Sequence, residues 1–180
     1  RGRIYTSWPV VVVANHPHGI VDGMIVADLI GRVRPDYRSL TRSLLTSIDE
    51  VAGSYMIPVP FPHDPDAQRK GVEMRAKAMS FLKDGGVVAL FPSGVVASSE
   101  TFFGPAVEAE WNVFTAKMIR RSGAQVVPMK FPGANSRAYY IAHKISLMLS
   151  PVSYILLTPP TLYTLQFSML VVPRIITIYI

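Results

Sequence analysis

The sequence predicts an α/β fold, a three-layer sandwich with a mixed, largely parallel sheet, and three observations support this. Short runs of consecutive β-branched residues are typical of strands that are covered on both faces. Segments of helical periodicity alternate with these runs, as they do in α/β proteins. The chain has 180 residues, 49% of them hydrophobic, which is enough for one buried core. The composition excludes a disordered chain, and the length is short of the roughly 250 residues usual for a TIM barrel.

The first half of the chain is expected to contain two strands and a helix. Trp8–Ala14 (WPVVVVA) is an apolar run suited to a buried strand. A polar loop follows, and then Asp22–Ile30 is expected to form a buried helix. Tyr55–Phe61 alternates in polarity but contains Pro58 and Pro60, which indicates an edge strand or an extended loop.

The second half continues the alternation of helices and strands. Gln68–Lys83 has a helical apolar stripe, and Asp84–Gly86 is expected to end that helix. Val87–Phe91 is a second apolar strand, a helix is expected near Ala109–Arg121, and Gln125–Lys130 is a third strand. In such sheets the reactive loops lie at the carboxyl ends of the strands.

Charge is unevenly distributed along the chain. Residues 1–110 carry 11 basic and 12 acidic side chains, whereas residues 111–180 carry seven basic and no acidic ones. This predicts an anionic partner, such as an acidic bilayer or a phosphorylated substrate, or else a basic face that serves solubility. No nucleic-acid partner is expected, because no aromatic residues are interleaved with a basic run. Four arginines are expected to form a surface patch: Arg32, Arg34, Arg38 and Arg42.

One domain is expected over residues 1–150, followed by an apolar tail over residues 151–180. Ile145–Pro173 contains no charged residue over 29 positions, a length that could span a membrane, but three prolines interrupt it. Packing in the core or on a membrane surface is therefore expected. The chain has no cysteine, which excludes disulfides, thiolate metal sites and a cysteine nucleophile. It begins at Arg1, without an initiator methionine, and is interpreted as a fragment.

The stretch Asn15–Gly23 (NHPHGIVDG) carries the chemical signal. A histidine in the loop after a buried strand, here His16, can pair with an aspartate in the first turn of the next helix, here Asp22. The carboxylate would fix the imidazole tautomer and make the histidine a better general base, so no serine or cysteine nucleophile is required. His18 is expected to point to the opposite side, in a structural or tuning role. Asn15 is expected to hold the loop by hydrogen bonds to the backbone.

This stretch resembles block I of the glycerolipid acyltransferases, the lysophosphatidic acid acyltransferase superfamily, which have Asn-His, four or five further residues, and then Asp. Its Pro-His-Gly and its five-residue spacing are most similar to the bacterial haemolysin-like branch, which includes acyltransferases of ornithine-lipid synthesis. Three further segments resemble blocks II, III and IV in the same order: Ile57–Phe61 (IPVPF), Leu90–Ser98 (LFPSGVVAS) and Val126–Arg137 (VVPMKFPGANSR). The last includes the Gly-x-Asn-Ser element of that branch. The resemblance covers about residues 5–150.

The resemblance implies a glycerol-phosphate acyltransferase-like fold over residues 1–150. It also implies an O-acyltransferase that moves a fatty acyl chain from acyl-coenzyme A or acyl carrier protein to the hydroxyl of a lyso-lipid, in phospholipid or ornithine-lipid synthesis. His16 would be the general base and Asp22 its partner, with no metal and no cofactor other than the acyl donor. The expected substrate-binding residues are His18, Ser93, Gly94, Asn135, Ser136 and Arg137, and the expected structural residues at the site are Asn15, Gly19 and Pro128.

The resemblance also implies finer roles and a location. The Gly94 N–H would face the oxyanion, and Pro128 would shape the floor of the site. Membrane lipid and the acyl donor would be the partners, at the cytoplasmic face of a membrane. Phosphate-acceptor members have Phe-Pro-Glu-Gly-Thr-Arg in block III, but here Ser93, Val95 and Val96 replace Glu, Thr and Arg, and block II lacks its arginine. These departures disfavour a phosphoglycerol acceptor and favour another headgroup, such as that of a lyso-ornithine lipid.

Three alternatives remain open on the sequence. The chain could act on neutral lipids, because the diacylglycerol acyltransferases also carry His-Pro-His-Gly. His16, His18 and Asp22 have a spacing that metal ligands use, which would suit a metal-dependent hydrolase. Finally, the basic end and the apolar tail would suit a non-catalytic membrane-binding module.

Overall fold

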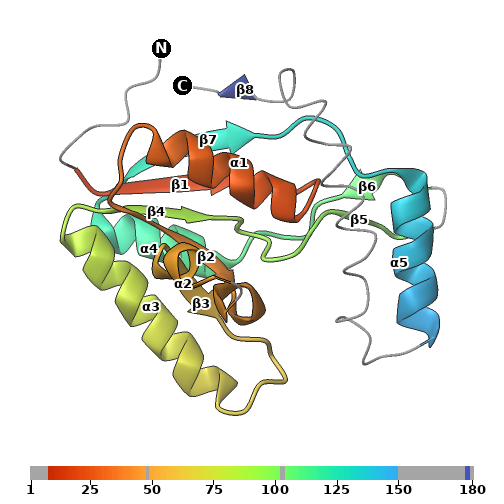
Figure 1. Ribbon diagram of the computed structural model, residues 1–180, viewed down its shortest axis with the longest axis horizontal. Coiled ribbons are helices and arrows are strands. Elements are labelled where there is room, and N and C mark those ends of the chain that lie inside the picture. The colour runs from red at the N-terminus through yellow and green to blue at the C-terminus, as the bar shows by residue number, and fades with distance from the viewer. Residues whose placement is uncertain (1–7, 48, 102–103, 150–176, 179–180) are drawn as a thin grey trace.

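The computed structural model describes residues 8–47, 49–101, 104–149 and 177–178. The elements in chain order are β1 (Val10–Ala14), α1 (Ile20–Gly31), β2 (Tyr37–Arg42), the 3-10 helix η1 (Ser43–Ser47), α2 (Glu50–Ser54), β3 (Met56–Val59), α3 (Ala67–Lys83), β4 (Val87–Leu90), β5 (Ser98–Ser99), β6 (Ala106–Val107), α4 (Val113–Ser122), β7 (Gln125–Lys130), α5 (Arg137–Leu149) and β8 (Thr177–Ile178). Figure 1 shows α1 on one face of the main sheet and α3 with α4 on the other.

The main sheet has the strand order β3-β2-β4-β1-β7-β8. The first five strands are parallel, and β8 pairs with β7 in the antiparallel direction. The chain leaves β1 toward β2 and β3, returns to β4, and then crosses to β7 on the far side of β1. The predicted α/β class and the largely parallel sheet are confirmed.

The valines of β1 explain why the core has two halves. Val10 and Val12 pack in the cluster that contains Val26 and Ile30 of α1. Val11 and Val13 pack in the cluster on the other face, which contains side chains of α3 and α4. These four valines are at most 4% exposed, and burying each contributes roughly 1.5–3 kcal/mol. The uninterrupted apolar run is therefore the consequence of a strand covered on both sides.

Two of the differences from the sequence-based expectation have a clear physical cause. Tyr37–Arg42 forms strand β2, which the apolar-run criterion does not detect because its side chains are polar and only half-buried. The expected helix near Ala109–Arg121 begins only at Val113, because the Asn112 side chain caps it by accepting a hydrogen bond from the Phe114 N–H at 2.8 Å. Met56–Val59 lies at the edge of the sheet, as its prolines predict.

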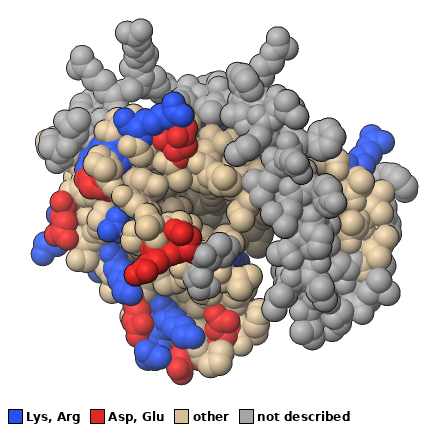
Figure 2. Space-filling view, viewed as in Figure 1, with Lys and Arg blue, Asp and Glu red and all other residues tan. Residues whose placement is uncertain are grey.

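The expected tail over residues 151–180 lies outside the described residues, apart from the two residues of β8. None of the helices within the described ranges combines the length and the hydropathy that a membrane crossing requires. The charge asymmetry is less simple in space than along the chain. On the face in Figure 2, basic and acidic residues are interleaved over the side of the molecule formed by α3.

Candidate active site

The loop from β1 to α1 brings His16 and Asp22 into contact. The Nδ1 atom of His16 lies 3.0 Å from Oδ2 of Asp22. The Asp22 side chain is fully buried in the first turn of α1, whereas the His16 side chain is 16% exposed. The Nε2 atom of His16 has no hydrogen-bond partner among the described residues. This nitrogen is therefore free to accept a proton from a bound molecule.

His18 binds the same carboxylate. Its Nδ1 atom lies 3.1 Å from Oδ1 of Asp22, and its backbone N–H donates to Oδ2 at 2.8 Å. The expectation that His18 points to the opposite side is therefore wrong. The chain turns tightly between the two histidines, so that each ring faces one oxygen of Asp22.

These contacts set the ionisation of Asp22. Burial raises the pKa of its carboxyl, but hydrogen bonds from the side chains of His16 and His18 and from the His18 backbone together outweigh burial and hold the pKa below its ordinary value. Asp22 is therefore a carboxylate at neutral pH, as a residue that stabilises an imidazolium must be.

The position of His16 is fixed by three contacts that sequence reasoning missed. The ring of Phe91 stacks on the imidazole with 3.9 Å between the ring centroids and 18° between the planes. The backbone N–H of His16 donates to Glu108 Oε2 at 3.2 Å, and the backbone carbonyl oxygen of His16 accepts from the Ala97 N–H at 2.8 Å. Phe91 carries a signal in its position directly after a buried strand, but nothing in the sequence connects Glu108 to a residue 92 positions away.

Asn15 and Gly19 hold the two ends of the loop. The Asn15 amide donates to the Phe131 carbonyl oxygen at 2.8 Å and accepts from the Phe131 N–H at 2.7 Å, which ties the end of β1 to the end of β7. Gly19 has φ 75° and ψ −130°, a conformation that favours glycine, and its carbonyl oxygen accepts from the Asp22 N–H. Both residues thus shape the loop that carries the histidines.

The turn after β4 lies beside this loop, but its hydrogen bonds differ from those expected. The Gly94 N–H donates to the Phe91 carbonyl oxygen at 2.9 Å, so in this arrangement it is not available to an oxyanion. The Ser93 hydroxyl donates to the Val95 carbonyl oxygen at 3.0 Å. The backbone N–H groups of Ser93, Val95 and Val96 have no partner among the described residues and are unused donors of the turn.

The segment after β7 approaches the site through Gly133. A Cβ at Gly133 would lie 3.4 Å from Nε2 of His18, so the backbone passes close to that ring. Asn135, Ser136 and Arg137 follow at the start of α5, where Ser136 Oγ accepts from the Tyr139 N–H at 3.2 Å. The Asn135 side-chain nitrogen is buried without a partner in the described part of the chain.

The structure also places Pro128 and the four arginines. Pro128 lies in β7 opposite Val13, and its side chain is exposed. The four arginines do not form one surface patch. Arg34 is 4% exposed, and Arg42 donates to the carbonyl oxygens of Gly94 at 2.9 Å and Pro60 at 3.3 Å. Arg42 thus contacts the turn of the candidate site, which the expectation of a solvated patch had missed.

The described residues contain no group of three histidine, cysteine or acidic side chains placed to hold a metal ion. His16 and His18 both direct Nδ1 at an oxygen of Asp22, so both rings are hydrogen-bonded to one carboxylate. The arrangement instead has the form of a carboxylate that orients an imidazole. Comparison of the chain with models of known protein families and with curated proteins finds no match.

Proposed function

We propose that the chain is an O-acyltransferase that moves a fatty acyl group from a thioester, acyl-coenzyme A or acyl carrier protein, to the hydroxyl of a lyso-lipid. The observation that carries this proposal is the contact of 3.0 Å between His16 Nδ1 and the buried Asp22 carboxylate, with Nε2 of the same ring left free. An oriented imidazole of this kind is a general base for a hydroxyl group. The position of the pair at the carboxyl end of a central parallel strand supports a reactive site there.

The reaction follows from these groups. Nε2 of His16 takes the proton of the acceptor hydroxyl, and the oxygen attacks the thioester carbonyl carbon. The resulting imidazolium is stabilised by Asp22, whose lowered pKa keeps it negative. When the carbon–sulfur bond breaks, the imidazolium returns the proton to the departing sulfur, which gives a free thiol and an ester.

The tetrahedral intermediate needs hydrogen-bond donors for its oxyanion. Because the Gly94 N–H is already bonded to Phe91, we assign this role to the N–H groups of Val95 and Val96 in the same turn. Phe91 covers one face of the imidazole, so the acceptor approaches at the ring edge that carries Nε2. His18 steadies the second oxygen of Asp22.

The finer assignments belong to the same proposal. The fold would be of the glycerol-phosphate acyltransferase type, and the enzyme would work at the cytoplasmic face of a membrane, with the lipid as partner. The valines at 95 and 96 leave the turn without the charged side chain that binds phosphate in related motifs, so the acceptor would have a headgroup other than phosphoglycerol.

The test follows release of free thiol from acyl-coenzyme A with a thiol-reactive dye, in the presence of a panel of lyso-lipids whose products are identified by mass spectrometry. We expect His16→Ala to lower turnover by about 10²–10⁴-fold, the usual contribution of a general base. His63→Ala, which removes an exposed histidine on another loop, is the matched control and should leave turnover unchanged. Equal turnover in the parent and His16→Ala would overturn the mechanism.

A further inference from the structure

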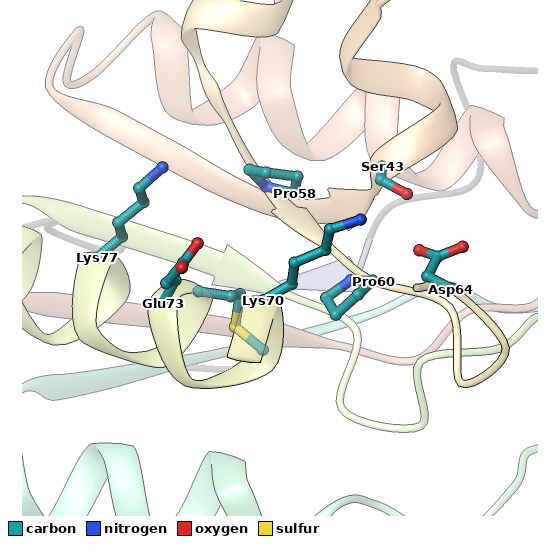
Figure 3. Close-up of a pocket in the computed structure, with 8 residues that line it drawn as sticks. Ser43, Pro58, Pro60, Asp64, Lys70, Glu73 and Lys77 are labelled. Atoms are coloured by element: carbon teal, nitrogen blue, oxygen red, sulfur yellow. The ribbon is translucent and has the colours of Figure 1, made fainter. Parts of the chain in front are cut away.

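A pocket of about 290 Å³ lies between α3 and the edge strand β3, at the same end of the sheet as His16. One side of it is lined by Ser43, the first residue of η1 after β2, and by Pro58 and Pro60, in and after β3. Lys70 and Lys77 rise from α3 on the other side, with Lys70 reaching over the strand toward Ser43 (Figure 3). The two lysines are seven residues apart and therefore share one face of the helix.

The pocket is lined by two lysines and two carboxylates, and the carboxylates are engaged by other groups. Glu73 lies between the lysines, but its carboxylate binds Arg69 at 2.7 Å. Asp64 accepts from the Phe61 N–H at 2.8 Å. Neither Lys70 nor Lys77 has an ion-pair or hydrogen-bond partner among the described residues. The two ammonium groups, which have no polar partner in the described part of the chain, can therefore bind an anion.

Arg42 connects this pocket to the candidate active site. One guanidinium donates to the carbonyl oxygen of Pro60, which lines the pocket, and to that of Gly94, in the turn beside His16. The same guanidinium lies over the ring of Phe61, with 5.0 Å between Cζ and the ring centroid. The two places are therefore separated by a single side chain.

The separation limits what the anion can be. In the sheet, β1 is two strand spacings from β2 and three from β3. Because neighbouring strands lie about 4.8 Å apart, the pocket is roughly 10–15 Å from the loop of His16. In glycerol phosphate the reacting hydroxyl and the phosphorus are four or five bonds apart, which reaches only ~6 Å. The arm of phosphopantetheine has about 13 bonds between phosphorus and sulfur and reaches ~16 Å.

The geometry points to a donor subsite: Lys70 and Lys77 bind the phosphate at the far end of the pantetheine arm while the thioester lies beside His16. This inference rests on the proposed function and adds the position of the donor. Coenzyme A carries a diphosphate at this end of the arm and an acyl carrier protein carries a phosphodiester to a serine, so either donor places a phosphate group at the subsite. Arg42, which links Pro60 to Gly94, lies along the path of the arm.

The experiment compares two donors, acyl-coenzyme A and the acyl thioester of N-acetylcysteamine, which has no phosphate. For the double variant Lys70→Gln/Lys77→Gln we expect kcat/KM for acyl-coenzyme A to fall about tenfold. The kcat/KM for the N-acetylcysteamine donor and the KM for the acceptor should not change. Lys83→Gln/Lys117→Gln removes the same charge elsewhere on α3 and on α4 and should leave both donors unaffected. An equal fall for both donors, an unchanged kcat/KM, or a rise in the acceptor KM alone would overturn the subsite.

A binding measurement separates this inference from the proposed function. By calorimetry, the parent should bind 4′-phosphopantetheine about tenfold more tightly than pantetheine, and Lys70→Gln/Lys77→Gln should remove that difference. A parent that binds both equally well contradicts the subsite. If the parent binds 4′-phosphopantetheine more tightly than pantetheine but shows no turnover with any acceptor, the proposed acyltransferase activity is contradicted and the phosphate site is retained.

Discussion

Two ionic clusters lie at opposite ends of the sheet and are built differently. At the end where the parallel strands begin, the guanidinium of Arg34 binds the Asp36 carboxylate and the carbonyl oxygens of Trp8 at 2.9 Å and Gly85 at 2.6 Å. These partners lie within two residues of the starts of β2, β1 and β4. At the other end, Asp22 holds His16 and His18, and the Nε2 atom of His16 remains unbonded within the described structure.

The two buried charges differ in whether the groups bound to them keep a further free atom. Arg34 directs its donors at groups of the protein itself and so joins the starts of three neighbouring strands. Asp22 is as deeply buried, but the groups that it binds are imidazoles, each of which has a second nitrogen directed elsewhere. We therefore expect the Arg34 cluster to govern stability and the Asp22 cluster to govern turnover.

The largest effect is expected for Asp22→Asn. The amide keeps the size of the side chain but removes the charge that stabilises the imidazolium, so turnover should fall by about 10²–10⁴-fold. Thiol release measures this, and circular dichroism checks that the variant is folded. A folded Asp22→Asn protein that retains full turnover would contradict the expectation that the Asp22 cluster governs turnover.

Arg34→Met should have the next largest effect, and on stability. It leaves two backbone carbonyl oxygens without a donor, and we expect a loss of about 2–4 kcal/mol in the free energy of unfolding, limited because the Asp36 side chain is 50% exposed. Urea unfolding measures this. Arg32→Met, which breaks an exposed pair with Asp28, is the control and should cost less than about 1 kcal/mol. Turnover of folded Arg34→Met should match the parent.

His18→Ala should give a smaller loss of turnover than His16→Ala. It removes one hydrogen bond to a charged acceptor, whereas the backbone N–H of residue 18 still reaches Asp22, so we expect about a tenfold decrease. The comparison of both variants by thiol release identifies the base. A nearly inactive His18→Ala together with an active His16→Ala would transfer the role of base to His18.

The smallest effect concerns acid stability. Hydrogen bonds from the two histidines outweigh burial and lower the pKa of Asp22, and the hydrogen bond from Arg34 lowers the pKa of Asp36. A carboxyl whose pKa is lower in the folded state stabilises the fold above its unfolded pKa of ~3.9, and that contribution is lost as pH falls through the folded value. Below about pH 4, the free energy of unfolding measured in urea should therefore depend less on pH in Asp22→Asn and in Asp36→Asn than in the parent.

The contributions of Asp36 and Asp22 to stability should respond differently to salt. The exposed half of Asp36 is screened at 1 M NaCl, where the Debye length is ~3 Å, but the fully buried Asp22 is not. The difference in the free energy of unfolding between Asp36→Asn and the parent should therefore shrink at 1 M NaCl. The corresponding difference between Asp22→Asn and the parent should persist. Equal salt sensitivity of the two would contradict their different burial.

Runs of consecutive apolar residues predicted the strands that are buried on both faces. β1 and β4 are such strands, and they lie at the centre of the sheet. The same criterion failed for β2, because its half-buried residues, among them Arg38 and Arg42, include long polar side chains that cover apolar rings. The start of α4 was misplaced because a single cap, Asn112, decides it.

For the candidate site, the sequence predicted the local contacts and missed the distant ones. His16 and Asp22 are six residues apart, so a short loop and one helical turn suffice to bring them together. Glu108 and Arg42 contact the same region through the fold, and no local pattern marks them. Burial of Arg34 was missed for the same reason, since its partners come from three separate strand ends.

The clamp on Asn15 has a consequence for the chemical ageing of the protein. Deamidation of asparagine requires the backbone nitrogen of the next residue to attack the side-chain amide carbon through a five-membered ring. Here both polar atoms of the Asn15 amide are bonded to Phe131, and the nitrogen that would attack belongs to His16 and is held by Glu108. The contacts that position the histidine therefore also disfavour succinimide formation beside it, and the loop should keep its covalent structure for as long as it stays folded.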